Sequence, residues 1–193
     1  IAAVEKALSD DRMMAIFSQK DSEVQDPGEG DVYQVGSLVK IIKNVKMPGN
    51  KLSVVIQGVS RIRMRTFNSD LPYLSAEVEV LEEQEPHGLE IEEKREQLRD
   101  LAQKVFDLSP QVPSEASFLV RSTASEISKL ADVIAININI ENEERQDLLS
   151  TIDIEERVDK VLEFLNKEIQ VLELSNKIQS KVKGEMDKAQ REY

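Results

Sequence analysis

The segment IEERVDKVLEFLNKEIQVLELSNKIQSKVKGEMDKAQREY, residues 154–193, decides how the second half of the chain is organised. It contains no proline and a single glycine, Gly184, so one uninterrupted helix of about 40 residues is expected. At 1.5 Å per residue such a helix is roughly 60 Å long, well beyond the diameter of a small domain. Asp153 stands three residues before Glu156, a spacing that suits a variant of the capping box and predicts the helix start.

The apolar residues of this predicted helix form two stripes that point in different directions. With about 100° between successive residues, the apolar direction rotates by about 130° near the middle of the helix. The first stripe comprises Val158, Val161, Leu162, Leu165, Ile169 and Leu172. The second stripe comprises Val171, Leu174, Ile178, Val182, Met186 and Ala189, and Phe164 falls on the same face. One hydrophobic core cannot cover both stripes of a straight helix, so we expect the first to pack on helices of its own domain.

The second stripe then needs a different neighbour. A neighbouring chain, a following domain or water could face it. We take Ile178, Val182 and Met186 as candidate residues for assembly or for a tether to another domain. The alternative is that the C-terminal half frays, or packs back through a bend near 175–176.

Residues 87–152 are predicted to form a helical bundle. Spacings of three and four mark a first helix that Ser109-Pro110 ends, with Leu98, Leu101, Val105 and Leu108 on its apolar face. Pro113 and Ser114 can start the next helix. A further apolar stripe runs over 127–138, although the alternation ININI at 136–140 also suits a strand. A short helix is expected at 143–149.

Residues 1–86 are predicted to form a β-rich subdomain after a short helix at 1–8. Met13–Phe17 is a continuous apolar run, typical of a buried strand. Asp26–Asp31 has the composition of a loop. Met47-Pro48-Gly49-Asn50 suits a type II turn with Gly at positive φ. Strands are therefore expected at 38–45 and 52–56 around this turn, and period-two alternation adds strands at 61–66 and 76–80, giving a small twisted sheet or partly closed barrel.

Three arginines alternate with less polar residues in the predicted strand at 61–66. Arg61, Arg63 and Arg65 would therefore share one face of the sheet. That face could bind an anion or a nucleic acid. The interpretation we favour is a solvated face whose charges lie near Glu77 and Glu79 on the neighbouring strand.

The composition excludes several classes of function. The chain has 25 basic and 37 acidic residues, a net charge of −12, which disfavours non-specific binding to nucleic acid or to anionic membranes. It has no cysteine, so disulfides, thiolate-bound zinc and a Cys nucleophile are excluded. No apolar run approaches the ~20 residues that span a membrane, and no secretory signal is present. The first residue, Ile1, indicates a trimmed N-terminus.

No catalytic, cofactor-binding or metal-binding group of residues stands out. The single histidine, His87, lies in a predicted turn without evident partners for a metal site or a triad. No G-x-x-x-x-G-K-[ST] segment occurs, and Gly28-Glu29-Gly30 lacks the third glycine of a dinucleotide loop. The segment at 58–62 lacks the final glycine of a nucleophile elbow. We therefore expect this chain to bind rather than to catalyse, with no cofactor of its own.

Several segments resemble the N-terminal domain of Lon-type ATP-dependent proteases, in the same order along the chain. In the first half these are DVYQVGS at 31–37, IIKN at 41–44, MPG at 47–49, VIQGVSRI at 55–62 and LPYLSAEV at 71–78. In the second half they are LADVIA at 130–135, RQDLL at 145–149, KVKGEMDK at 181–188 and QREY at 190–193.

The resemblance implies an α+β fold. A β-rich, PUA-like pseudobarrel (1–86) is followed by a helical bundle (87–152) and a long helix (153–193) leading toward an ATPase domain. The family's opening strand before Ile1 is absent from this sequence, which would leave an unpaired sheet edge. The resemblance also implies a homohexameric, ATP- and Mg²⁺-dependent serine endopeptidase as the parent. It favours the bacterial cytoplasm over the mitochondrial matrix.

On this basis we expect a non-catalytic region that recognises misfolded and regulatory protein substrates and supports hexamer assembly, touching its own ATPase domain and neighbouring subunits. Bulky apolar residues of predicted loops are the candidate substrate contacts: Met47, Pro48, Phe67, Leu71, Pro72 and Tyr73. A stand-alone protein-binding adaptor of the same fold is the alternative. An RNA-binding role is a third hypothesis, which the charge disfavours because residues 1–85 and 86–193 carry net charges of −4 and −8. Neither nucleic acid nor membrane is an expected partner.

Overall fold

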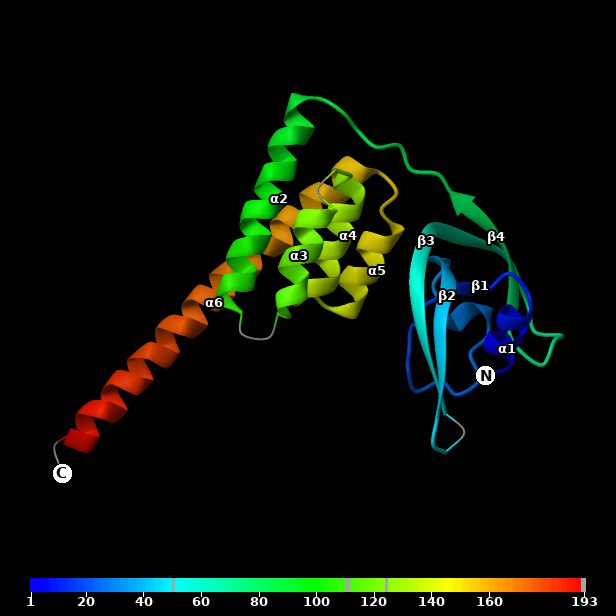
Figure 1. Ribbon diagram of the computed structural model, residues 1–193, viewed down its shortest axis with the longest axis horizontal. Helices are drawn as coiled ribbons and strands as arrows, with labels where there is room; N and C mark the ends of the chain where they lie inside the picture. Colours follow the sequence, from blue (N-terminus) through cyan, green and yellow to red (C-terminus); the bar gives the residue numbers. More distant parts are fainter. Residues whose placement is uncertain (50, 110–111, 124, 192–193) are drawn as a thin grey trace. The chain divides into compact units, whose positions relative to one another are not determined.

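The computed structural model describes residues 1–49, 51–109, 112–123 and 125–191 (Figure 1). The chain divides into two compact units, Ile1–Glu82 and Glu83–Tyr193. The first unit holds the β-sheet and the second holds the main helices, so the expected α+β fold is confirmed. The bundle and the long helix, which the sequence suggested as separate segments, belong to the same unit and share one hydrophobic core.

The first unit is a four-stranded antiparallel sheet with the strand order β1-β2-β3-β4. Its strands are connected in chain order, and a short helix precedes them. The elements are α1 (Ala2–Ser9), β1 (Met13–Ile16), the 3₁₀ turn η1 (Glu29–Asp31), β2 (Val35–Met47), β3 (Lys51–Asn68) and β4 (Ser75–Leu81). The buried apolar side chains are aliphatic apart from one methionine, as suits a composition poor in aromatics, and include Val32, Val35, Val39, Ile41, Ile62 and Met64.

The hairpin between β2 and β3 forms at the predicted turn. Met47 pairs with Lys51, and Gly49 has φ +79°, the positive value expected of it. Asn50 lies outside the described residues. The prediction of two separate strands at 52–56 and 61–66 was wrong, because β3 runs without interruption for 18 residues. Gly58 does not end the strand, since the register shift between Leu38 and Val39 absorbs an extra residue of β3 as a bulge.

Strand β1 differs from the buried strand expected at Met13–Phe17. It ends at Ile16, and both Ala15 and Ile16 are exposed. The reason is its place at the edge of the sheet, where it pairs with β2 alone. Gly36 of β2 permits this pairing, because a Cβ atom there would lie 2.2 Å from the Ile16 carbonyl oxygen and 2.5 Å from Cδ1 of Phe17.

The arginines of β3 only partly follow the expected solvated face. Arg65 forms an ion pair with Glu79 of β4, as predicted, and Arg63 lies opposite Glu79 in the register. Arg61, by contrast, is buried. The strand register does not explain the difference, since Arg63 is also flanked by β2 and β4 and is exposed.

In the described residues, the second unit consists of five helices around one largely aliphatic core. They are α2 (Leu89–Leu108), α3 (Ser114–Ser122), α4 (Ile127–Asn137), α5 (Asn142–Ser150) and α6 (Ile154–Arg191). The helices predicted in this region are all present, and Pro113 precedes α3 as expected. Pro110, the predicted end signal of α2, lies outside the described residues. No helix in the described ranges combines the length and apolar character that crossing a membrane would need.

The segment 136–140, where helix and strand competed, ends α4 and contains no strand. Arg145 of α5 supplies the reason. Its guanidinium donates hydrogen bonds to the carbonyl oxygens of Ala135 and Ile138, both at 3.0 Å. These carbonyls at the end of α4 are therefore satisfied by a side chain, so the chain can turn without a strand partner.

Helix α6 has 38 residues and therefore a length of about 57 Å. The Asp153 carboxylate accepts a hydrogen bond from the Glu156 backbone N–H at 2.8 Å, which confirms the predicted N-terminal cap. Val158, Val161 and Leu165 are fully buried in the core of the unit. The expectation that the first stripe packs on its own domain is thus confirmed.

Candidate functional site

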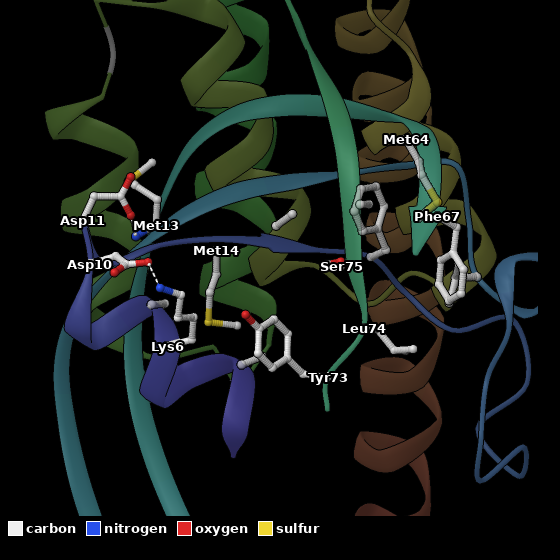
Figure 2. Close-up of a pocket in the computed structure, with 16 residues that line it drawn as sticks. Lys6, Asp10, Asp11, Met13, Met14, Met64, Phe67, Tyr73, Leu74 and Ser75 are labelled. Carbon is white, nitrogen blue, oxygen red and sulfur yellow. Dashed lines mark hydrogen bonds and ion pairs between the residues drawn. The ribbon is translucent and has the colours of Figure 1, made fainter. Parts of the chain in front are cut away.

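The first unit contains an apolar pocket of about 390 Å³, which Figure 2 shows in close-up. Its wall is assembled from α1, β1, the end of β3, and the connection from β3 into β4. The volume lies within the range of pockets that hold a small ligand or a large side chain. The lining residues of apolar character are Ala3, Ala7, Met13, Met14, Ala15, Phe17, Val32, Met64, Phe67, Tyr73, Leu74 and Ala76.

Three of the five methionines of the chain line this pocket. Met64 is buried in the sheet, whereas Met13 and Met14 are half-buried. The Met14 side chain points toward the Tyr73 ring. Methionine is unbranched and polarisable, so its side chain adapts to apolar partners of different shape. The pocket wall is therefore suited to binding varied side chains rather than one defined ligand.

Charged groups lie only at the edge of the pocket. The Lys6 ammonium forms an ion pair with the carboxylate of Asp10, the residue that follows α1, at 2.8 Å (Figure 2). This hydrogen bond, with the charge of Asp10, raises the pKa of Lys6. The Asp11 carboxylate accepts a hydrogen bond from the Met13 backbone N–H at 2.9 Å. These polar groups satisfy one another, which leaves the interior of the pocket apolar.

The connection from β3 to β4 forms a partly exposed part of the wall. Asn68 pairs with Ser75 at the end of the ladder, and the Asn68 side chain accepts a hydrogen bond from the Asp70 backbone N–H at 2.8 Å. Leu71 and Leu74, within this loop, are 47% and 48% exposed. The loop thus presents apolar side chains next to the opening of the pocket.

The structure separates the six predicted substrate-contact residues into three places. Phe67 and Tyr73 line the pocket. Leu71 and Pro72 lie in the same loop but are exposed and do not line it. Met47 and Pro48 lie at the tip of the β2–β3 hairpin, where both are exposed. Phe67, expected in a loop, is a residue of β3 paired with Ala76, and the other three follow it in the β3–β4 connection. Nothing in the described structure joins the hairpin tip to the pocket.

Sequence reasoning missed most of the pocket wall. The sequence predicts Met13, Met14 and Met64 as strand residues and does not mark Leu74 as a loop contact, yet all four line the pocket. The available signal was the clustering of methionine in two strands of a chain with only five. Such a signal is weak, because buried methionine is common in ordinary cores.

The second stripe of α6 forms a separate surface, which we call the exposed helix face. Ile178, Val182 and Met186, the predicted assembly residues, are 55%, 50% and 60% exposed. Val171 and Leu174 continue the same face and are exposed as well. Phe164, the outlier of the pattern, packs against the core of the unit instead. The side chain of Ala189 lies outside the described part of the chain. The helix is continuous through 175–176, so the bend considered as an alternative is absent.

Neither surface has the composition of a catalytic or metal centre. Among the described residues, no three His, Asp or Glu side chains come together in a way that could hold a metal ion. His87 is exposed in the connection before α2. What the arrangement offers chemically is contact with apolar groups.

Comparison with known proteins places this geometry in a family. Residues 1–167 match the family model of the ATP-dependent protease La (LON) substrate-binding domain. The chain is 40% identical over 194 residues to Lon protease 2 of Myxococcus xanthus and 40% identical over 193 residues to the Lon protease of Dictyoglomus thermophilum. Each alignment covers 100% of this chain but only 23% and 24% of those relatives, so the chain spans about a quarter of their length.

A solved structure agrees with the fold. The N-terminal domain of a Mycobacterium avium complex Lon protease superposes with a TM-score of 0.60 at 18% identity, over 86% of this chain and 83% of that one. At this identity the likeness concerns the fold alone. The match of the family model over well over half of the sequence decides the assignment: the chain belongs to the family of substrate-binding domains of the ATP-dependent protease La (LON).

Proposed function

We propose that this chain is the non-catalytic substrate-recognition region of an ATP-dependent serine endopeptidase, and that the methionine-lined pocket binds apolar side chains of misfolded and regulatory proteins. The observation that carries the proposal is this pocket in the β-sheet unit of a chain whose family is defined by substrate binding. The sequence contains no G-x-x-x-x-G-K-[ST] segment. We therefore assign ATP and Mg²⁺ binding and the proteolytic chemistry to other parts of a longer protein. The proposed location of that protein is the bacterial cytoplasm.

Recognition through one pocket would be weak and reversible. Burying one large apolar side chain contributes about 1.5–3 kcal/mol. Even a millimolar dissociation constant requires about 4 kcal/mol, so a single side chain holds a substrate only briefly. Several copies of the domain in one assembly would raise the overall affinity through multivalency. Brief contacts suit a region that delivers an unfolded chain onward rather than retaining it.

The proposal is tested by filling the pocket. Ala3 lines the pocket, whereas Ala2, its neighbour on α1, is exposed and does not. Ala3→Phe and Ala2→Phe therefore add the same ring inside and outside the pocket. Binding of reduced, carboxymethylated lysozyme, a permanently unfolded probe, is measured by fluorescence anisotropy. We expect the dissociation constant to be about fivefold larger for Ala3→Phe, because the added ring removes about 1 kcal/mol of apolar contact between probe and pocket. We expect no change for Ala2→Phe. Equal binding by both variants contradicts the assignment of the pocket.

We further propose that the exposed helix face supports assembly of a homohexamer, by contacting the ATPase part of the protein or a neighbouring subunit. Five large apolar residues at 50–60% exposure on one side of a single helix favour this role. The alternative is a stand-alone adaptor. Whether the reading frame continues past Tyr193 into a Walker A segment distinguishes the two hypotheses.

A further inference from the structure

Positive charge is concentrated in one part of this acidic chain. Residues 32–69 contain seven basic residues and no acidic residue. The other 155 residues hold the remaining 18 basic residues and all 37 acidic ones. Four of the seven are lysines of the β2–β3 hairpin: Lys40, Lys43, Lys46 and Lys51. A positive local field on a protein of negative net charge favours a negatively charged partner at that place.

The strand register places three of these lysines on one face. Lys40 lies opposite Gln57, Lys43 opposite Val55, and Met47 opposite Lys51. Side chains alternate along β3, so Lys51, Val55 and Gln57 share one face of the hairpin. The register shift at Ile42 puts their partners on β2, together with Val45, on that same face. We call this surface the basic ribbon face, consisting of Lys40, Lys43, Val45, Met47, Lys51 and Val55.

The basic ribbon face is open to solvent over its whole length. Its three apolar members, Val45, Met47 and Val55, are 43%, 51% and 54% exposed. The opposite face of the same hairpin begins with Val39 and Ile41, which are buried in the core of the unit. The exposed apolar side chains are therefore not part of that core. Apolar groups gathered on one exposed face indicate a binding surface.

The hairpin extends beyond the rest of the sheet. Pairing with β1 ends at Lys40, and pairing with β4 begins at Arg61. Between these residues β2 and β3 pair only with each other among the described strands. A two-stranded ribbon gains little stability by itself, so its exposed apolar residues are better explained by binding than by folding.

The lysines of the basic ribbon face are available for a partner. Within the described part of the chain, Lys40, Lys43 and Lys51 take part in no ion pair. Their aliphatic stems can lie along apolar neighbours while the ammonium groups remain in water. The face thus alternates apolar contact area with free positive charge.

We propose that the basic ribbon face binds extended polypeptide segments in which aliphatic residues are interspersed with Asp or Glu. This inference rests on the proposed function and adds a substrate class to it. Aliphatic side chains of the bound segment would cover Val45, Met47 and Val55, and its carboxylates would pair with the lysines. Single-stranded nucleic acid fits less well, because residues 35–60 contain no aromatic side chain on which a base could stack.

The test compares two dye-labelled, unstructured peptides of the same aliphatic content, which carry either Glu or Gln at the same positions. Binding to the complete chain is measured by fluorescence anisotropy at low and high salt. We expect the Glu peptide to bind about tenfold more tightly at low salt, and high salt to remove the difference. Lys43→Glu combined with Lys51→Glu should abolish the preference and leave binding of the Gln peptide unchanged.

Lys46→Glu is the matched control, because Lys46 lies opposite Leu52 on the other face of the same hairpin. The single variant Lys43→Glu should reduce the preference severalfold more than Lys46→Glu does. Equal effects of the two would show a diffuse charge effect and overturn the inference. Equal affinity for both peptides overturns the inference alone, whereas failure to bind either peptide overturns the proposed function too. A single-stranded oligonucleotide that binds more tightly than the Glu peptide would assign the face to nucleic acid instead.

Discussion

The guanidinium of Arg157 donates a hydrogen bond from Nη1 to Oε1 of Glu83 at 2.5 Å, inside the helical unit. Arg157 is fully buried on α6, and the same Nη1 also donates to the Thr151 carbonyl oxygen at 3.0 Å. Glu83 is the first residue of the unit, directly after the sheet unit ends. Two residues later, Glu85 accepts hydrogen bonds from the side chain and backbone of Ser128 on α4. The first residues of the helical unit are thus fixed to the bundle by two half-buried carboxylates.

Removal of the Glu83 charge should destabilise the helical unit. Glu83→Gln leaves the buried Arg157 without its closest carboxylate, and breaking a buried pair from one side is costly. Because Glu83 is itself 22% exposed, we expect about 2–3 kcal/mol lower free energy of unfolding rather than the full range of buried pairs. Urea unfolding followed by far-UV circular dichroism measures the change. Glu82→Gln, at the exposed neighbouring position, is the control and should be neutral.

Charges placed on the exposed helix face should weaken self-association. Val182→Glu with Met186→Glu puts two carboxylates where an apolar contact is proposed, so concentration-dependent association in sedimentation equilibrium should be lost. The unfolding transition of the sheet unit should remain. Ser180→Glu, on the opposite side of α6, should associate like the parent protein. A monomer in all three proteins would assign the face to the ATPase part, and loss of the sheet unit's transition in the double variant would refute the surface role.

Gly36 should tolerate no side chain. In Gly36→Ala the new Cβ would lie 2.2 Å from the carbonyl oxygen of Ile16, so β1 must move away from β2. Overpacking of this kind costs about 1–3 kcal/mol, and displacement of Phe17 should also weaken binding at the pocket. Gly58→Ala on β3, where the added Cβ meets nothing within 4 Å, is the matched control. Equal thermal midpoints for the two variants would contradict the close approach of β1.

Two glutamates of α6 should change stability with pH in opposite directions. Lys104, 2.8 Å from Glu173, lowers the pKa of that carboxyl by hydrogen bonding and charge. The ionised Glu173 therefore stabilises the fold above pH 4.5, and this stabilisation is lost as the pH falls. Burial raises the pKa of Glu168, because it disfavours the charged form. The folded state therefore carries no penalty from Glu168 below pH 4.5, and it becomes less stable as the pH rises and this carboxyl ionises.

Accordingly, Glu173→Gln should lower the urea midpoint at pH 7, by a small amount because that pair is exposed to solvent. Glu168→Gln should raise the midpoint at pH 7. At lower pH both differences should shrink, because the stabilisation from Glu173 is lost as the pH falls and Glu168 becomes protonated. Shifts of the same sign for the two variants at pH 7 would contradict the assigned environments.

Periodic patterns within one segment were enough to predict a large part of the fold. The two stripes of α6, its start at Asp153, and the turn at Gly49 were all read correctly, because each depends on residues that are close in the sequence. The strand alternation near Arg63 and Arg65 was equally local. Propensity and periodicity act over a few residues, so tertiary contacts did not need to be known.

Only the tertiary structure decided the pocket and the burial of polar residues. Met14, Met64 and Tyr73 line one pocket although they come from three different elements, and their meeting depends on the register of the sheet. Arg61 and Arg157 look like surface residues in the sequence, yet both are buried in the folded chain. The basic ribbon face likewise exists only because the bulge near Ile42 brings Lys40 and Lys43 to the same side. Local sequence determines how a segment folds, whereas packing between segments determines which of its side chains are covered and which remain free to bind.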